Sequence, residues 1–307
     1  MTEDDLSDLN SSTGPRIGAV CVLYGAPRIP GILRDLAQRG VDVVIVDNSD
    51  DLDPAEVAGN SLRVVRPGRN LGYSRGVNAG VEAMPIRPDA LLIVNPDIVG
   101  DPDALLDFAR TVAASPEPLL AAPAGGDGHF GYLPTAPPWL IVGQYVLRSS
   151  WHPRPKEEDD MFLSGALLGL NRAAIDRVAP DNALLDPTLF FMDDVELTDR
   201  ARRLGCRVAE IGPVGDLDHE GGTSMRRRPA VRIYFSRISK VRYWQGRSPV
   251  IGAMMRGFFL AETSVGQLVS GRSAPDGSAG HGFAAARRWL RHPDPQIDEV
   301  VLGNDHA

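Results

Sequence analysis

Residues 190–205, FFMDDVELTDRARRLG, carry four carboxylates followed by three arginines. A carboxylate so placed could act as a general base, taking the proton from an attacking hydroxyl group. Helix formation accounts for three of the four: Asp193 is a good N-cap, Glu196 follows at capping-box spacing, and Glu196 and Asp199 each precede an arginine by four residues. Asp194 is left over, because a charge at the first helical position gains only about 0.3–1 kcal/mol from the helix dipole. The spacing leaves both interpretations of Asp194 open, a helix-start charge and a catalytic base.

A second candidate site lies in residues 66–80, RPGRNLGYSRGVNAG, which combine four glycines with asparagines and arginines. Backbone N–H groups and guanidinium groups at the start of a helix can bind an anion such as a phosphate. A tight turn followed by close helix packing would use the same small residues, so that alternative stays open. The stretch is not a dinucleotide-binding fingerprint, because Gly25 is the single glycine directly after the first predicted strand.

Two further polar residues could bind a divalent metal ion. Asp97, in VNPD, offers hard oxygen ligands of the kind that magnesium or manganese uses when it bridges phosphates. An Asn-Pro turn capped by Asp97 is the structural alternative. His219, in HEGGTS, offers an imidazole ligand suited to manganese-like ions, although a single histidine more often has a structural role.

The elements that must position these residues alternate between continuous apolar runs and runs with helical spacing. This βαβ alternation predicts an α/β fold in which helices cover a mostly parallel sheet. The carboxyl ends of parallel strands form one ligand-binding edge, where DNSDD (47–51) and NPD (95–97) both fall. The predicted strands are 16–24, 41–51, 61–68, 89–97, 118–123, 162–171 and 206–211, and the predicted helices are 30–40, 74–84, 101–115, 172–179 and 193–205.

The rest of the chain has weaker signals. Residues 124–160 predict a long functional loop or excursion, because they are rich in Gly and Pro and have little periodicity. The apolar stretch 250–269 contains charged residues, which favours a surface or partner-facing helix, open to homodimer formation, over a membrane span. From residue 271 the polar sequence predicts a mobile tail, in which FAAARRWLR (283–291) alone is helix-like.

Composition and charge limit the class of protein. The 307 residues, 43% hydrophobic and 23% charged, predict one large domain with appendages. The acidic start lacks the features of a secretory signal, so we expect a cytoplasmic protein in which Cys21 and Cys206 are buried small hydrophobic residues and not a disulfide.

The net charge of −8 hides a basic block, since nine basic residues and no acidic residue lie between Gly221 and Ala261. Interleaved with aromatic residues, this block suits diphosphates, nucleic acid or anionic lipid headgroups, and we expect residues 226–247 to offer a peripheral contact with the inner face of an anionic membrane. The alternative is a helical face whose partners are acids elsewhere in the fold. We set nucleic acid aside as a minor option, to be restored by steeply salt-sensitive binding.

The ordered motifs of residues 17–245 resemble the family 2 glycosyltransferases, especially their bacterial rhamnosyltransferase-like branch. They are VDNSDD, RNLGYSRGVNAG, LIVNPD, FLSGALLGLNR, LFFMDDVELTDRARRLG and HEGGTS. The resemblance implies a Rossmann-like GT-A fold, a role in cell-wall or polysaccharide synthesis, and transfer of a sugar with inversion. The implied donor is a dTDP- or UDP-linked sugar, with rhamnose the first guess. The implied acceptor is a glycan, a lipid-linked molecule or a small molecule, and the implied cofactor is Mg²⁺ or Mn²⁺.

The match also assigns roles to individual residues. Asp194 falls on the catalytic base, Asp97 and His219 on the metal side, and Gly165 and Asp193 on the acceptor side. The implied donor-binding residues are Leu23, Tyr24, Asp47, Asn48, Asn70, Gly72, Arg75, Asn78 and Asn95.

This chain departs from the family pattern at three places. Asn95 stands where many relatives have the first Asp of D-x-D, which weakens the implied metal site. Asp193 stands where a Glu usually precedes the base. Of the usual Gly-Gly-Phe-Asp motif before the base, Asp186 alone is kept, so acceptor specificity can differ.

The expected organisation is a disordered tail (1–15), a GT-A domain (16–245), an amphipathic C-terminal helix (246–270) and a mobile tail (271–307). Two other functions stay open. A sugar nucleotidyltransferase would share the fold, but it would want a glycine-rich basic signature where this chain has YGAPRIP. A non-catalytic nucleotide-sugar-binding or scaffold protein would not need Asp97, Asp194 and His219 together.

Overall fold

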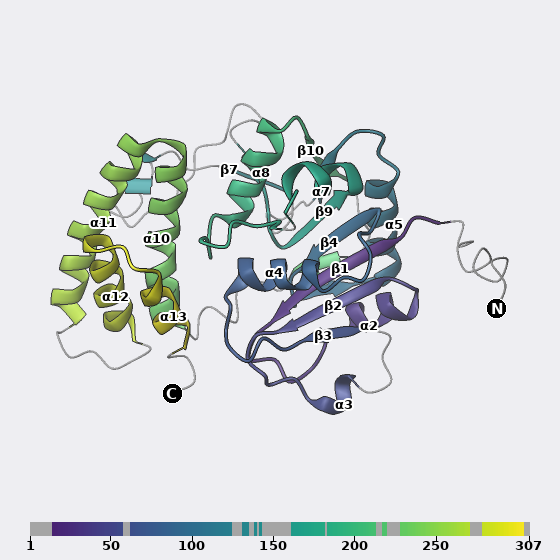
Figure 1. Cartoon of the computed structure of the whole chain (residues 1–307), viewed down its shortest axis with the longest axis horizontal. Coiled ribbons are helices and arrows are strands. Elements are labelled where there is room, and N and C mark those ends of the chain that lie inside the picture. The colour runs from purple at the N-terminus through teal and green to yellow at the C-terminus, as the bar shows by residue number, and fades with distance from the viewer. Residues whose placement is uncertain are drawn as a thin grey trace.

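The structure of the protein is a computed structural model (Figure 1). It describes residues 14–57, 62–124, 131–134, 138–139, 141–142, 161–181, 183–212, 217–219, 228–270 and 278–303. The expected disordered tail and most of the expected 124–160 excursion lie outside these residues.

A seven-stranded sheet forms the centre of the larger part of the molecule, in the order β10-β6-β9-β4-β1-β2-β3. Every neighbouring pair is parallel except those of β9, which runs antiparallel to β4 and β6. The predicted α/β class with a mostly parallel sheet is therefore confirmed. The strands are β1 (Ile17–Leu23), β2 (Asp42–Asp47), β3 (Arg63–Val65), β4 (Ala90–Val94), β6 (Leu119–Pro123), β9 (Leu167–Asn171) and β10 (Arg207–Ile211).

Helices cover both faces of this sheet, which is why the central strands are continuous apolar runs. On one face α2 (Gly31–Gln38) and α5 (Pro102–Ala113) pack against Ile17, Ala19, Cys21 and Leu23 of β1. On the other face Val20 and Val22 of β1 belong to the core that includes the second set of helices. These are α4 (Tyr73–Glu82), α7 (Arg172–Val178) and α8 (Asp193–Arg203).

One predicted strand is wrong. The stretch 162–171 forms two strands, β8 (Met161–Leu163) and β9, because the turn at Ser164–Ala166 interrupts the backbone ladder. β8 pairs with β7 (Tyr132–Pro134). Two more short strands, β5 (Ile98–Gly100) and β11 (Leu217–His219), form an antiparallel pair, and α3 (Pro54–Val57) is a single turn.

The C-terminal part is a helical cluster beside the sheet (Figure 1). It consists of α10 (Pro229–Arg247), α11 (Pro249–Ser270), α12 (Ala279–Arg291) and α13 (Pro295–Gly303). The expectation of a mobile tail is wrong for 279–303, because Trp289, Leu290 and Leu302 are buried in a core shared with α10 and α11. The helix α10 begins at Pro229, and most of its buried residues belong to this core. None of the helices within the described ranges has both the length and the hydropathy for a bilayer crossing.

Candidate active site

A cavity of about 370 Å³ opens where β1 and β4 end and where α4, α8 and α10 begin. Four charged residues line it: Asp97, Asp193, Asp194 and Arg228. The other lining residues are Val22, Tyr24, Asn48, Asn70, Gly72, Tyr73, Asn95, Pro96, Ser164, Gly165, Ala166, Phe190 and Phe191. The cavity thus lies at the sheet edge that the sequence predicts.

The start of α8 brings two adjacent carboxylates into this cavity. The N-cap is Met192, in a left-handed conformation with φ of 70°, and its carbonyl accepts the N–H of Glu196 at 2.9 Å. The prediction of Asp193 as N-cap is therefore wrong. The preceding aromatic pair fixes this turn, because the N–H groups of Phe190 and Phe191 both donate to the hydroxyl of Ser239 on α10.

Backbone groups hold the carboxylate of Asp194. It accepts hydrogen bonds from the N–H of Val195 at 2.8 Å and from the N–H of Gly165, in the turn after β8, at 3.2 Å. Burial raises the pKa of Asp194 to about 6, although these two hydrogen bonds oppose the rise. Burial, and then the charge of Asp194, raise the pKa of Asp193 well above its usual range. A carboxylate with a pKa near 6 suits proton transfer at neutral pH.

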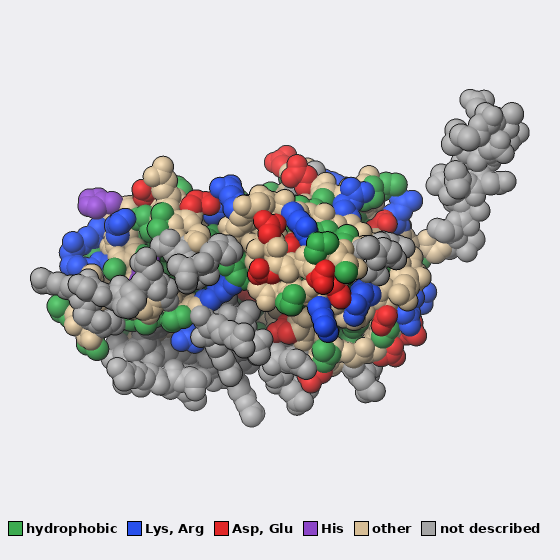
Figure 2. All heavy atoms as spheres, turned by 90° about the horizontal axis from the view of Figure 1, so that it is seen from below, with side chains coloured by type: hydrophobic (Ala, Val, Ile, Leu, Met, Phe, Trp, Pro, Cys, Tyr) green, Lys and Arg blue, Asp and Glu red, His purple; other side chains and the backbone are tan. Residues whose placement is uncertain are grey.

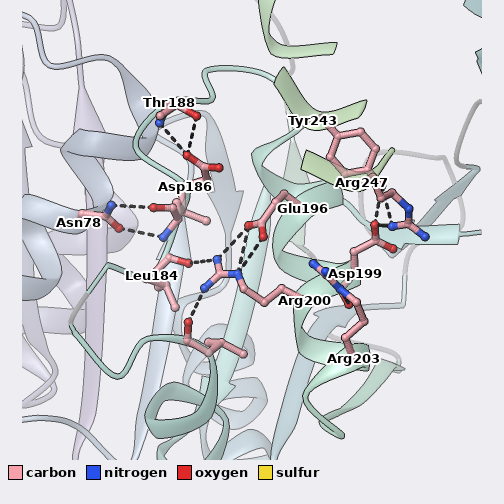
Figure 3. A network of polar contacts seen from close by, with 12 residues as sticks. Asn78, Leu184, Asp186, Thr188, Glu196, Asp199, Arg200, Arg203, Tyr243 and Arg247 are labelled. Atoms are coloured by element: carbon pink, nitrogen blue, oxygen red, sulfur yellow. Dashed lines mark hydrogen bonds and ion pairs between the residues drawn. The ribbon is translucent and has the colours of Figure 1, made fainter. Parts of the chain in front are cut away.

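The two later carboxylates of α8 have cationic or phenolic partners (Figure 3). Glu196 forms the predicted ion pair with Arg200, whose Nε lies 2.9 Å from Oε1. Asp199 accepts a hydrogen bond from the hydroxyl of Tyr243 and forms an ion pair with Arg247, both on α10. The ion pair predicted between the side chains of Asp199 and Arg203 is not formed. Arg203 donates a hydrogen bond to the backbone carbonyl of Asp199.

The expected metal side has a carboxylate and an amide at the end of β4. Asp97 and Asn95 both line the cavity, and the Oδ1 of Asn95 accepts a hydrogen bond from the hydroxyl of Tyr73 at 3.0 Å. Burial, and then the charge of Asp193, raise the pKa of Tyr73 well above its usual range, so the phenol stays protonated as a donor. His219 is the last residue of β11 and pairs with Ile98 of β5, the residue that follows Asp97. The side chain of His219 lies outside what the structure describes.

These oxygen ligands fit a hard divalent cation in type but supply only part of a coordination shell. Within the described residues, no group of three or more His, Cys, Asp and Glu side chains is placed to hold a metal ion. Of the two predicted metal ligands, Asp97 lines the cavity, and the side chain of His219 lies outside what the structure describes.

Five of the predicted donor-binding residues line the cavity, namely Tyr24, Asn48, Asn70, Gly72 and Asn95. The amide of Asn48 also organises the glycine-rich segment, because its Nδ2 donates to the carbonyl of Gly72 at 3.0 Å. Gly72 has a φ of +78°, and a Cβ there would lie 3.1 Å from the ring of Phe190. This position therefore requires glycine both for its backbone angle and for the close approach of the ring.

The other four predicted donor-binding residues do not line the cavity. Leu23 is buried in the core. Asp47 is also buried. Its carboxylate accepts hydrogen bonds from the N–H groups of Ser49 and Leu52 and forms an ion pair with Arg66. Arg75 forms an ion pair with Glu299 of α13. The amide of Asn78 donates to and accepts from the backbone of Leu185. These residues hold the cavity's walls in position.

The sequence interpretation missed Arg228 as an individual site residue. Its guanidinium carbon lies 3.2 Å from the centroid of the Tyr24 ring, and both residues line the cavity. The signal was present, because Arg228 belongs to the basic block, but nothing in the sequence separated it from its neighbours. Arg237, Arg242 and Arg247 pair with Glu262, Asp298 and Asp199, as the alternative interpretation of that block expects.

No protein-family model matches the chain, and no curated protein matches it either. Similar solved structures include a mannosyltransferase from Pyrobaculum calidifontis in complex with GDP-Man and Mn²⁺, at 14% identity and a TM-score of 0.47, over 95% of this chain and 74% of that one. GalNAc-T7 with UDP, GalNAc and Mn²⁺ is similar at 12% identity and a TM-score of 0.46, over 93% of this chain and 57% of that one. The 4-diphosphocytidyl-2C-methyl-D-erythritol synthase from Anaerococcus prevotii is similar at 10% identity and a TM-score of 0.43, over 69% of this chain and 93% of that one. The assignment of function therefore depends on the residues of the cavity.

Proposed function

We propose that this chain is an inverting glycosyltransferase of the GT-A type, which moves a sugar from a nucleotide-diphosphate donor to the hydroxyl group of an acceptor. The observation that carries the proposal is that the carboxylates of Asp194 and Asp97 line one cavity at the carboxyl edge of a mostly parallel sheet. Ligands of such sheets bind at this edge. One carboxylate serves the acceptor and the other serves the donor.

Asp194 acts as the general base. As the acceptor oxygen attacks the anomeric carbon, its proton moves to the carboxylate of Asp194, and the bond from that carbon to the diphosphate oxygen breaks. A single displacement of this kind inverts the anomeric carbon. The N–H of Gly165, at 3.2 Å from Oδ2, keeps the carboxylate oriented to accept the proton.

Arg228 and the glycine-rich segment receive the diphosphate. Tyr24 holds the guanidinium of Arg228 against the cavity, where its positive charge offsets the charge that develops on the leaving group. The first turn of α4, which begins at Tyr73, has backbone N–H groups at the same wall, whereas the N–H of Gly72 donates to Oδ1 of Asn70. These groups bind the donor before the sugar is transferred.

Asp97 is the residue that would hold a divalent cation, and His219 is a second candidate ligand. A bound Mg²⁺ or Mn²⁺ supplies Lewis-acid stabilisation of the diphosphate charge. The donor that we propose is dTDP- or UDP-linked, with rhamnose the first sugar to test. The acceptor that we propose is a glycan, a lipid-linked molecule or a small molecule.

Calorimetric titration of the full chain with dTDP, UDP and GDP, each with Mn²⁺, with Mg²⁺ and with chelator, is the experiment that tests the proposal. We expect one nucleotide to bind, more tightly with metal, and Asp97→Asn to remove the metal dependence. Asp101→Asn is the matched control, because Asp101 is an exposed N-cap of α5 that does not line the cavity. Failure of all three nucleotides to bind would overturn the donor assignment. Binding without transfer of the matching sugars to any acceptor or to water would favour the scaffold alternative.

A further inference from the structure

The outer face of α11 is apolar along its whole length. Val250, Met254, Val265, Leu268 and Val269 are between 61% and 84% exposed. The small residues Ala253, Gly257 and Ala261 are exposed between them. At 1.5 Å per residue this strip is about 28 Å long, and α11 lies at the edge of the molecule farthest from the sheet (Figure 1). Apolar patches of this extent mark interaction surfaces.

The charged residues of α11 have partners on the inner side of the helix. Glu262 forms a bidentate ion pair with Arg237, whose side chain is almost fully buried. The guanidinium of Arg256 donates to the carbonyls of Leu290 and Arg291 at the end of α12. The exposed positions of α11 therefore carry no charge, which is unusual for a helix on a surface in water.

Basic residues of α12 lie beside α11. Residues 228–270 and 278–303 contain ten basic and four acidic side chains, whereas the whole chain has a net charge of −8. Arg287 of α12 donates a hydrogen bond to the side chain of Gln267 near the end of α11. The hydrogen bonds of Arg256 bring the last turn of α12 beside the first half of α11. Arg288 and Arg291, in that last turn, are exposed. Lys and Arg side chains are visible at this end of the molecule (Figure 2).

We propose that the exposed face of α11 lies on an anionic lipid surface, with the basic residues of α12 contacting the headgroups. An apolar helix face with arginines on the helix beside it has the two features of an interfacial helix. A second copy of the chain is the weaker occupant, because two helical clusters that each carry a net charge of +6 repel one another at close range. The proposal does not depend on the proposed enzymatic activity. It moves the expected membrane contact away from residues 226–247, where Arg237, Arg242 and Arg247 are engaged within the fold.

Co-sedimentation of the full chain with vesicles of phosphatidylglycerol and phosphatidylcholine, compared with phosphatidylcholine alone, is the first test. We expect binding to the anionic vesicles and at least tenfold weaker binding to the neutral ones. The double variant Val265→Asp and Leu268→Asp should weaken binding to anionic vesicles at least tenfold. The control is Ile86→Asp, because Ile86 is a 50% exposed apolar residue before β4, and it should bind as the unaltered chain does.

A second pair of variants tests the charges separately. Arg288→Gln and Arg291→Gln should each weaken binding about fivefold at low salt, since an arginine near an anionic surface contributes about 1 kcal/mol. These side chains are exposed, so loss of folding does not complicate the result. Equal binding to both kinds of vesicle, or none to either, would overturn the proposal. A dimer in light scattering that Val265→Asp separates would replace the lipid surface by a second copy.

Discussion

The first two residues of α8 and the part of the helix from Glu196 onward use the same residue types for different purposes. In the later part Glu196 and Asp199 are joined to Arg200, Tyr243 and Arg247, which fix α8 to its neighbours. At the start of the helix the carboxylate of Asp194 accepts hydrogen bonds from the backbone N–H groups of Val195 and Gly165 and lines the cavity, where burial raises its pKa to about 6. The partner of a carboxylate, and not its position on the helix, therefore decides whether it stabilises the fold or is free to accept a proton.

The largest expected effect comes from Asp194→Asn. An amide keeps the size of the side chain but cannot accept the proton, so kcat for sugar transfer should fall about 10²- to 10⁴-fold. Binding of the donor nucleotide should change less than threefold, because Asp194 serves the acceptor side. Steady-state kinetics and calorimetry measure the two quantities on the same preparation.

Asp199→Asn is the matched control on the same helix. Its partner Arg247 is 44% exposed, so loss of this ion pair should cost about 1 kcal/mol of stability or less and leave kcat within about twofold. If Asp199→Asn reduced kcat as much as Asp194→Asn does, the two parts of α8 would not differ in function and the base assignment would fail.

Arg200→Ala should produce the largest loss of stability in this region. The guanidinium of Arg200 donates to Glu196 and to the carbonyls of Val178 and Leu184, which ties α8 to α7 and to the loop that follows it (Figure 3). Removal leaves a half-buried carboxylate and two carbonyls without this donor, at a cost of about 2–4 kcal/mol. Urea unfolding measures the change.

The control for Arg200→Ala is Arg110→Ala on α5. Arg110 pairs with Asp107 on the surface, where both side chains are more than half exposed, so this change should cost less than about 0.5 kcal/mol. Equal losses for the two arginines would show that the part of α8 from Glu196 onward does not anchor the helix.

The sequence predicts the parts of this arrangement that depend on periodicity. Continuous apolar runs located β1 and β4, and the rule that parallel strands end at one edge predicted that Asn48 and Asp97 lie close together, as they do in the cavity. The role of the start of α8 was expected from the family resemblance. The partners of Arg75 and Asn78 were not predictable, because Glu299 and Leu185 are 224 and 107 residues away along the chain. The helix α13 and the packed position of α12, whose residues 283–291 were expected to be helix-like, were missed because packing of side chains such as Trp289, and not local sequence, stabilises them.

The pH dependence of kcat sharpens the comparison between the two parts of α8. Asp194 must be ionised to accept a proton, so with a pKa of about 6 the rate should be constant above pH 7 and fall about tenfold per unit below pH 6. The raised pKa also means that the folded chain holds this proton more tightly than the unfolded chain does. Its stabilising contribution is therefore full below the ordinary value of 3.8 and is lost as the pH rises through about 6. A kcat that stays constant from pH 8 to pH 4.5 would contradict the assignment.

Gly165→Ala gives the smallest of these effects and isolates the orientation of the base. A Cβ at Gly165 would lie 3.3 Å from the Cβ of Asp194 and 3.4 Å from its Oδ2, so the carboxylate must shift by a few tenths of an ångström while its charge is kept. We expect kcat to fall about fivefold with unchanged nucleotide binding and an unchanged pH midpoint, because misplacement of a catalytic group costs rate without altering its chemistry. Gly31→Ala, at an exposed helix start with nothing within 4 Å of the new methyl group, is the control and should leave kcat unchanged. A loss of nucleotide binding in Gly165→Ala would instead show that the turn after β8 belongs to the donor side of the cavity.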